Sequence, residues 1–290
     1  SSATLLAKHI KLYRKKNNLP VYDGGLGENP LPSPKSLIEA IKLNAHLKEY
    51  TSTDGIHELK QLLGNNLVVG NGLKPLIFLI QLAFSKLYPN GTIYHIIPAW
   101  VSYLEQTSIL NIKTKKIYPN EDYKLTPEIL EEYLKNDSNE KLVLLNNPCN
   151  PSGCIYNNEE MKNLSVIFKK YDCIVFSDEI YKEIVHPKYE FGNIKDYYSK
   201  IVRGSSLSKS VACGGYRLGW LIFDDSLNKL HKMCKVLASS IYSCPSIMLQ
   251  HAAVKSLEEP EDIILQKEFQ RHMFQNICEY CKDEFTSLHR

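Results

Sequence analysis

Six short apolar runs that alternate with helical patterns constrain the fold of this chain most strongly. The runs lie near 66–70, 92–97, 141–145, 173–177, 201–205 and 218–223. Helical periodicity follows at 74–88, 126–136, 158–171 and 226–240. Buried strands joined by helices form mostly parallel sheets that helices cover. The sequence therefore predicts an α/β domain, and it predicts a long polar helix from about residue 260.

Composition is that of a globular protein with a large core. The chain has 290 residues, of which 43% are hydrophobic and 23% are charged, enough for one large domain and a smaller one. The formal net charge of +3 gives no support for nucleic-acid binding. The sequence contains no apolar stretch of membrane-spanning length and no secretion leader, so we expect a cytoplasmic protein without a membrane partner.

Five residues of types that often occur in ligand sites follow five of the predicted strands. These residues are Gly72, Trp100, Asn150, Asp178 and Lys209. In open α/β sheets, ligands bind outside the carboxyl ends of the strands. One site at one edge of the sheet is therefore expected to gather all five.

The segment 206–209 places a lysine beside hydroxyl groups. It reads Ser206-Leu207-Ser208-Lys209, and Arg217 follows eight residues after the lysine. An amine nucleophile between a hydroxyl and a guanidinium suits an aldehyde cofactor with a phosphate tail. The alternative, a solvated loop with no ligand, stays open for this motif alone.

Two further segments strengthen the ligand hypothesis, because each follows an apolar run. They are 147–153, Asn-Pro-Cys-Asn-Pro-Ser-Gly, and 177–181, Ser-Asp-Glu-Ile-Tyr. Together with 206–209, they resemble the class I/II aminotransferases, pyridoxal-phosphate enzymes of fold type I, over about 22–271. The resemblance implies a mostly parallel seven-stranded sheet flanked by helices.

The resemblance also implies catalytic roles. Lys209 would form the Schiff base with pyridoxal 5'-phosphate and carry the proton from the substrate α-carbon. Asp178 would keep the ring nitrogen protonated, and Tyr181 and Asn150 would donate to the phenolic oxygen. Read without the family, Asp178 is a turn or helix-cap residue.

Further residues are implied to hold the cofactor. Trp100 would stack on its ring, although a core tryptophan is the plain alternative. The phosphate would meet a helix start, a hydroxyl and a guanidinium. These contacts would come from Gly72, Leu73, Lys74, Ser206 and Arg217.

Two residues nearer the N-terminus match family positions with less support from their surroundings. Tyr50 would reach the phosphate in a neighbouring subunit, which predicts a homodimer with shared active sites; otherwise it is an aromatic residue before a turn. Gly27 would pass beside the substrate carboxylate, and Asn150 would also contact substrate. Cys278 and Cys281 have the spacing of half a zinc site, but no second pair has suitable spacing and the histidines form no metal motif, so we expect no metal site.

The resemblance predicts three parts. Residues 1–45 would form an N-terminal arm and part of a small domain, 46–245 the large cofactor-binding domain, and 246–290 helices leading into the small domain. Family members usually continue further, so we expect that domain to be incomplete. The arginine that pairs with the substrate carboxylate is expected to be absent.

The function predicted from these motifs is transfer of an amino group between an amino acid and a 2-oxo acid by a ping-pong route. A lyase or decarboxylase would use the same motifs. A cofactor-binding protein without turnover is the alternative from another class. The motifs do not reveal which amino acid is the substrate.

Overall fold

A computed structural model describes residues 3–21 and 27–288 of the chain. Contacts between residues divide the chain into two units, 1–32 and 33–290, which are described separately. The first contains α1 (Ala3–Lys16), with three basic residues in its last turn. The second contains the sheet and the other elements named below.

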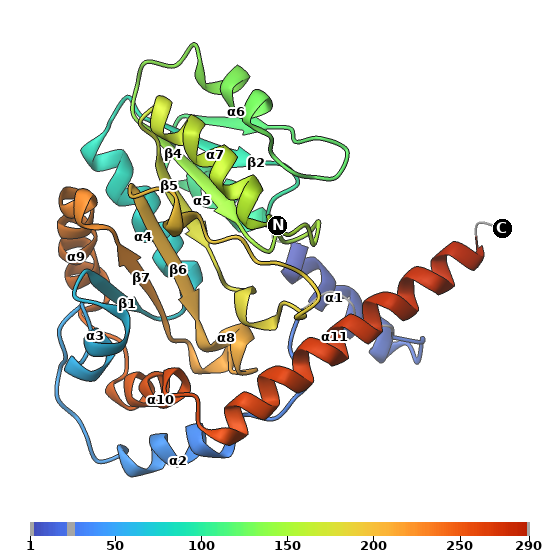
Figure 1. Cartoon of the computed structure of the whole chain (residues 1–290). Helices are drawn as coiled ribbons and strands as arrows, with labels where there is room; N and C mark the ends of the chain where they lie inside the picture. Colours follow the sequence, from blue (N-terminus) through green and yellow to red (C-terminus); the bar gives the residue numbers. More distant parts are fainter. Residues whose placement is uncertain (1–2, 22–26, 289–290) are drawn as a thin grey trace. The chain divides into compact units, whose positions relative to one another are not determined.

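A seven-stranded sheet forms the centre of the 33–290 unit (Figure 1). In chain order, its strands are β1 (Leu67–Gly70), β2 (Thr92–Ile96), β3 (Thr114–Ile117), β4 (Lys141–Asn146), β5 (Ile174–Asp178), β6 (Ile201–Ser206) and β7 (Gly219–Phe223). Their order across the sheet is β1-β7-β6-β5-β4-β2-β3. Strands β3, β2, β4, β5 and β6 pair in parallel, whereas β7 is antiparallel to both of its neighbours. This arrangement confirms the mostly parallel sheet predicted from the apolar runs.

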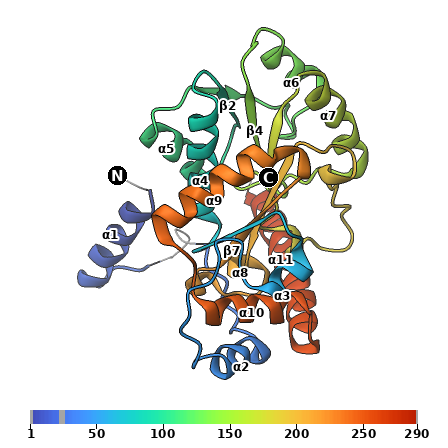
Figure 2. The same cartoon turned by 90° about the vertical axis from the view of Figure 1, so that its left-hand side faces the viewer.

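Helices cover both faces of the sheet. The sequence up to β6 contains α2 (Lys35–Leu43), α3 (His57–Leu63), α4 (Leu73–Leu87), α5 (Val101–Ile109), α6 (Pro127–Leu134) and α7 (Asn158–Lys170). After β6 come α8 (Leu207–Ser210), α9 (Asn228–Tyr242), α10 (Ile247–Leu257) and α11 (Glu261–Leu288). Helix α9 lies at the left of Figure 1 and faces the viewer in Figure 2, and α10 lies beside α2 in both views.

The strands are buried on both faces because their side chains alternate between two cores. In β4, Leu142 and Leu144 pack with α4 and α9. Val143 and Leu145 point the other way and pack with α6 and α7. A third cluster joins β1 and β7 to α2 and α10. Two-sided burial explains why these strands were visible in the sequence as continuous apolar runs.

Strand β3 and several short helices, namely α2, α3, α5 and α8, were absent from the prediction. Strand β3 is polar, lies at the edge of the sheet and buries only its last residue, Ile117, so no apolar run marks it. Helix α5 begins directly after Trp100 and has a weak apolar pattern. The polar helix expected from residue 260 is confirmed as α11. The predicted division of the chain into parts at residues 45 and 245 stays a prediction. In the structure, α2 and α10 pack against each other within the 33–290 unit.

Candidate active site

The carboxyl ends of β4, β5 and β6 bring most of the predicted site residues together. Asp178 is the last residue of β5, and Ser206 is the last residue of β6. Asn150 follows β4, and its amide nitrogen donates to the hydroxyl of Tyr181 at 3.2 Å. The ammonium nitrogen of Lys209 lies 5.9 Å from the centre of the same tyrosine ring. Tyr181 therefore links the loops after three parallel strands.

Asp178 is a buried carboxyl group with two donors among the described residues. Its side chain accepts hydrogen bonds from the Tyr103 hydroxyl at 2.5 Å and from the Ile180 main-chain nitrogen at 3.1 Å. The residue is only 3% exposed. Burial raises the pKa of Asp178 to about 6, although both hydrogen bonds act to lower it. A cationic N–H donor at this carboxylate would remove the cost of burying its charge.

Aromatic side chains continue the site on the side of α5. Trp100 precedes the helix, and its ring meets the Tyr103 ring edge-on with 5.5 Å between centres. The ammonium group of Lys74 lies 4.9 Å from the centre of the Trp100 ring. Lys74 therefore contacts an aromatic face at the start of α4.

The start of α4 offers main-chain donors beside an arginine. Gly72 caps the helix at φ 89° without a side-chain hydrogen bond, and Leu73 and Lys74 are its first two residues. A Cβ atom at Gly72 would lie 2.3 Å from Nη2 of Arg217, so glycine is needed for this approach. The N–H groups of the first helical turn lack intrahelical acceptors and favour an anion.

Hydroxyl groups complete this end of the site. Ser206 is 1% exposed, and its oxygen accepts a hydrogen bond from the Ser208 main-chain nitrogen at 3.2 Å. Nη1 of Arg217 lies 3.5 Å from the Ser208 hydroxyl and donates to the Gly214 carbonyl at 2.7 Å. A guanidinium, two hydroxyls and the helix start together match the donor set that a phosphate requires.

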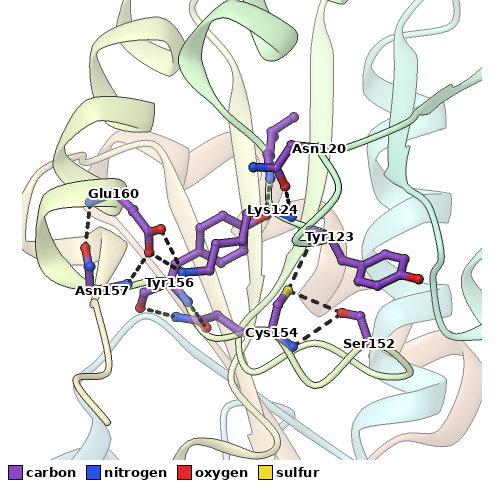
Figure 3. Close-up of polar contacts among 10 residues, drawn as sticks. Asn120, Tyr123, Lys124, Ser152, Cys154, Tyr156, Asn157 and Glu160 are labelled. Carbon is purple, nitrogen blue, oxygen red and sulfur yellow. Dashed lines mark hydrogen bonds and ion pairs between the residues drawn. The ribbon is translucent and has the colours of Figure 1, made fainter. Parts of the chain in front are cut away.

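Polar contacts hold the loop that carries Asn150. At the end of this loop, Asn157 and Glu160 bond reciprocally and cap α7, with 2.8 and 2.9 Å between partners. Lys124 pairs with Glu160 at 2.7 Å, and the Cys154 thiol donates to a main-chain carbonyl of the Lys124 loop at 3.3 Å (Figure 3). The neighbouring loop thus restrains Asn150 from outside the site.

The predicted roles of two residues, Tyr50 and Gly27, stay untested. Tyr50 lies in the loop between α2 and α3, and its side chain is 89% exposed. Gly27 belongs to the 1–32 unit, and its predicted role stays untested. The residues described by the structure, 3–21 and 27–288, contain no group of three or more His, Cys, Asp or Glu side chains able to hold a metal ion. None of their helices has the length and apolar character to cross a membrane.

Sequence reasoning missed two residues that support Asp178. Tyr103 lies three residues after Trp100 on the unpredicted helix α5, so its direction was not evident. Asn146 ends β4; its amide donates to the Asp178 carbonyl at 3.1 Å, and its oxygen accepts from the Asn150 main chain at 2.7 Å. A polar residue at the end of an otherwise apolar run was the available signal for Asn146.

Comparison with known proteins identifies the family. The model of the family described as "Aminotransferase class I and II" matches residues 21–289. The chain belongs to the class I and II aminotransferases. This aminotransferase is an enzyme that transfers amino groups between amino acids and 2-oxo acids, as its motifs predict.

Relatives of the aminotransferase carry names of the same activity. A probable aspartate aminotransferase of Methanocaldococcus jannaschii is 28% identical over 280 residues, covering 87% of this chain and 72% of the relative. The aspartate aminotransferase of Thermotoga maritima is 29% identical over 268 residues, covering 86% and 69%.

Solved structures agree with the fold. The aspartate aminotransferase from Rhizobium meliloti has a TM-score of 0.85 at 25% identity and covers 95% of this chain and 72% of its own. The Thermus thermophilus enzyme with maleate has a TM-score of 0.91 and covers 100% and 78%; at 20% identity it supports the fold alone.

Proposed function

We propose that this aminotransferase works with pyridoxal 5'-phosphate held at the carboxyl ends of β4, β5 and β6. The buried carboxyl group of Asp178 is the observation that carries the proposal. It accepts hydrogen bonds from the Tyr103 hydroxyl and the Ile180 main-chain nitrogen, neither of which carries a charge, and its pKa is raised to about 6. A protonated pyridine nitrogen is a cation with one N–H, which fits that carboxylate.

The other residues fit the remaining parts of the cofactor. Ser206, Arg217 and the main-chain N–H groups of Leu73 and Lys74 would bind its phosphate, with Gly72 allowing the arginine to approach. Tyr181 and Asn150 would donate to its phenolic oxygen. Trp100 would cover its ring and exclude water.

When bound, pyridoxal phosphate supplies an aldehyde for the amino group and a ring that accepts electrons from the substrate α-carbon. Asp178 would hold a proton at the ring nitrogen, which strengthens that acceptance. Lys209 would bind the aldehyde carbon and later move the proton of the α-carbon. The ammonium of Lys209 must lose a proton to do so, and the nearby Tyr181 ring limits its hydration on one side.

Borohydride trapping tests this proposal. After reduction of the cofactor-loaded protein, peptide mapping should place the label on Lys209, and Lys209→Ala should remove it. Lys182→Ala is the matched control, because Lys182 lies directly after Tyr181 and pairs with Glu179 at 3.9 Å. A label that persists in Lys209→Ala, or that maps to another lysine, would refute the assignment.

The names of the relatives make aspartate the first amino acid to test, with 2-oxoglutarate or pyruvate as acceptor. A ping-pong route predicts that amino acid alone changes the absorbance of the bound cofactor. Addition of the 2-oxo acid should then restore the original spectrum. A lyase would release product without needing an acceptor, and a protein without turnover would show no spectral change.

A homodimer with shared sites is the quaternary arrangement that we propose. It is supported by the 89% exposure of Tyr50, which suits a side chain that meets another subunit. Tyr50→Phe should weaken retention of the cofactor and leave the absorbance of the remaining bound cofactor unchanged. A monomer that retains the cofactor at low protein concentration would contradict the shared site. Cytoplasmic location and the contact of Gly27 with substrate stay predictions from the sequence.

A further inference from the structure

The first half of α11 contacts the turn that carries Lys209. Gln270 is fully buried, and its amide nitrogen donates to the Ser210 carbonyl at 2.9 Å. Ser210 directly follows Lys209 and ends the four-residue helix α8. The last carbonyl groups of a helix have no intrahelical donor, so a side chain from another element is one way to satisfy them. Gln270 therefore fixes the main chain next to the lysine.

The neighbouring residue on α11 contacts the turn that carries Tyr181. Nε of Arg271 donates to the Glu183 carbonyl at 2.8 Å. The buried ammonium of Lys267, one turn earlier, pairs with the Glu183 carboxylate at 3.1 Å. Glu183 lies in the short helix η1 (Lys182–Ile184), which begins directly after Tyr181. Helix α11 thus bonds to both the main chain and the side chain of Glu183 in this turn.

These contacts join two separate turns to one rigid element. Lys209 follows β6 and Tyr181 follows β5, and their side chains meet at the 5.9 Å contact described above. Adjacent residues of one helix, Gln270 and Arg271, reach one turn each. The distance between the amine and the phenol therefore depends on α11 as well as on the sheet.

We infer that Gln270 and Arg271 are positioning residues. In the cofactor-loaded enzyme they keep the Lys209 amine and the Tyr181 side chain at the separation that the reaction requires. This inference rests on the proposed function, because Lys209 and Tyr181 have their roles only toward that cofactor. Neither positioning residue needs to contact cofactor or substrate. Their effect would pass through the Ser210 and Glu183 carbonyl groups.

Substitutions that remove one donor and keep the size of the side chain test the inference. Gln270→Met and Arg271→Met remove the two donors. Arg271→Gln is the conservative variant, because its amide nitrogen is as many bonds from the main chain as Nε of arginine. Gln275→Met is the matched control on the same helix, since Gln275 donates to Glu279 within α11.

The variants are compared as cofactor-loaded enzymes with equal cofactor content. Misplacement of a reacting group costs turnover rather than affinity, so kcat should fall about tenfold or more in Gln270→Met and Arg271→Met while KM stays within about twofold. The pH midpoint of the absorbance change of the bound cofactor should rise in Arg271→Met, because Tyr181 would donate less well to the phenolic oxygen. Arg271→Gln should restore both values, and Gln275→Met should match the wild type.

The outcomes separate this inference from the proposed function. If the wild type takes no borohydride label at Lys209, the proposed function fails and the inference fails with it. If Lys209 is labelled but both Met variants keep wild-type kcat and the wild-type pH midpoint, only the inference is wrong. If Gln270→Met does not fold, the comparison of Arg271→Met with Arg271→Gln decides: equal values in these two variants would overturn the inference.

Discussion

Two buried carboxylates in this enzyme each accept a hydrogen bond from a tyrosine, yet their pKa values move in opposite directions. Asp178 accepts from Tyr103 at 2.5 Å, and Asp137 accepts from Tyr94 at 2.6 Å. They are 3% and 8% exposed. Burial raises the pKa of Asp178 to about 6. Burial also acts to raise the pKa of Asp137, but its hydrogen bonds outweigh it and hold the pKa well below its usual value.

The difference lies in the other partners of each group. Asp137 also accepts from the main-chain and side-chain nitrogens of Asn139, each at 3.1 Å, and pairs with the ammonium of Lys115 at 3.5 Å. Besides the Tyr103 bond, the Asp178 side chain accepts one hydrogen bond among the described residues, from the Ile180 main-chain nitrogen. An ionised carboxylate with a cation nearby needs no further charged partner. Asp137, which pairs with Lys115, is such a carboxylate. Under the proposed function, the protonated ring nitrogen of the cofactor would supply a positive charge to Asp178.

The two aspartates also differ in where they lie in the fold. Asp178 ends a central parallel strand, where ligands enter an open sheet, and the loops around it carry Lys209 and Asn150. Asp137 lies after α6 and bonds to β2, on the side of the sheet where α6 and α7 form their core. We therefore propose a structural role for Asp137 and a role in catalysis for Asp178.

The largest expected effect is on kcat, which should distinguish substitution of Asp178 from substitution of Asp137. Asp178→Asn should lower kcat by on the order of a hundredfold or more, because a fixed charge in a water-excluded site is lost. Asp137→Asn, the matched control, should stay within a few-fold of the wild type. Steady-state kinetics with aspartate and 2-oxoglutarate, at equal cofactor content, measures both. Similar losses in the two variants would remove the distinction drawn between them.

The second prediction concerns stability and pH in the cofactor-free protein. The folded pKa of Asp178, about 6, lies above the ordinary value of 3.8, so the folded state binds more protons between these values. The free energy of unfolding should therefore fall as pH rises from about 4 to about 6, by an amount on the order of 3 kcal/mol, and stay lower above that window. Asp178→Asn should remove this loss and be more stable than the wild type at pH 8.

The contribution of Asp137 to the free energy of unfolding changes with pH in the opposite direction. Its folded pKa is lowered, so its contribution to stability is present above the unfolded value of 3.8 and is lost as pH falls below it. Asp137→Asn should destabilise the protein at pH 8 by about 1–3 kcal/mol, the scale of a disturbed buried hydrogen bond. Urea unfolding at pH 4, 6 and 8 tests both variants. A stabilising Asp137→Asn or a destabilising Asp178→Asn at pH 8 would reverse the assignment.

The smallest effects are expected when the hydroxyl of either tyrosine is removed. A hydrogen bond to a charged group contributes about 1.5–3 kcal/mol, so Tyr103→Phe should lower kcat by roughly tenfold through its contact with Asp178. Tyr94→Phe removes the same kind of bond from Asp137 and should reduce stability while leaving kcat unchanged. Thermal unfolding and kcat, measured on both variants, give the comparison. Loss of activity in Tyr94→Phe at full cofactor content would count against a purely structural Asp137.

The sequence predicted the part of this site that lies on the sheet. Asp178, Asn150 and Lys209 follow strands buried on both faces, and such strands produce continuous apolar runs whose ends are visible in the sequence. The parallel pairing then requires that their carboxyl ends meet at one edge. For the same reason six of the seven strands were found, and only β3, which is polar and exposed, was missed.

Contacts between distant helices were not predictable in the same way. Tyr103 reaches Asp178 from α5, and Gln270 reaches Ser210 across 60 positions of sequence. Neither residue belongs to a motif, and their directions depend on how each helix packs. Opposite pKa shifts in Asp137 and Asp178 likewise follow from neighbours that only the folded chain brings together.

A site-resolved titration of the two carboxyl groups tests the central claim most directly. Carbon NMR of protein labelled at aspartate would follow Asp178 and Asp137 with and without pyridoxal phosphate. We predict that the pKa of Asp178 is near 6 in the free protein and falls below the ordinary 3.8 when the cofactor binds, because a cation then faces the carboxylate. The pKa of Asp137 should stay low in both states. An Asp178 pKa that is already low in the free protein, or that does not change on binding, would contradict the account.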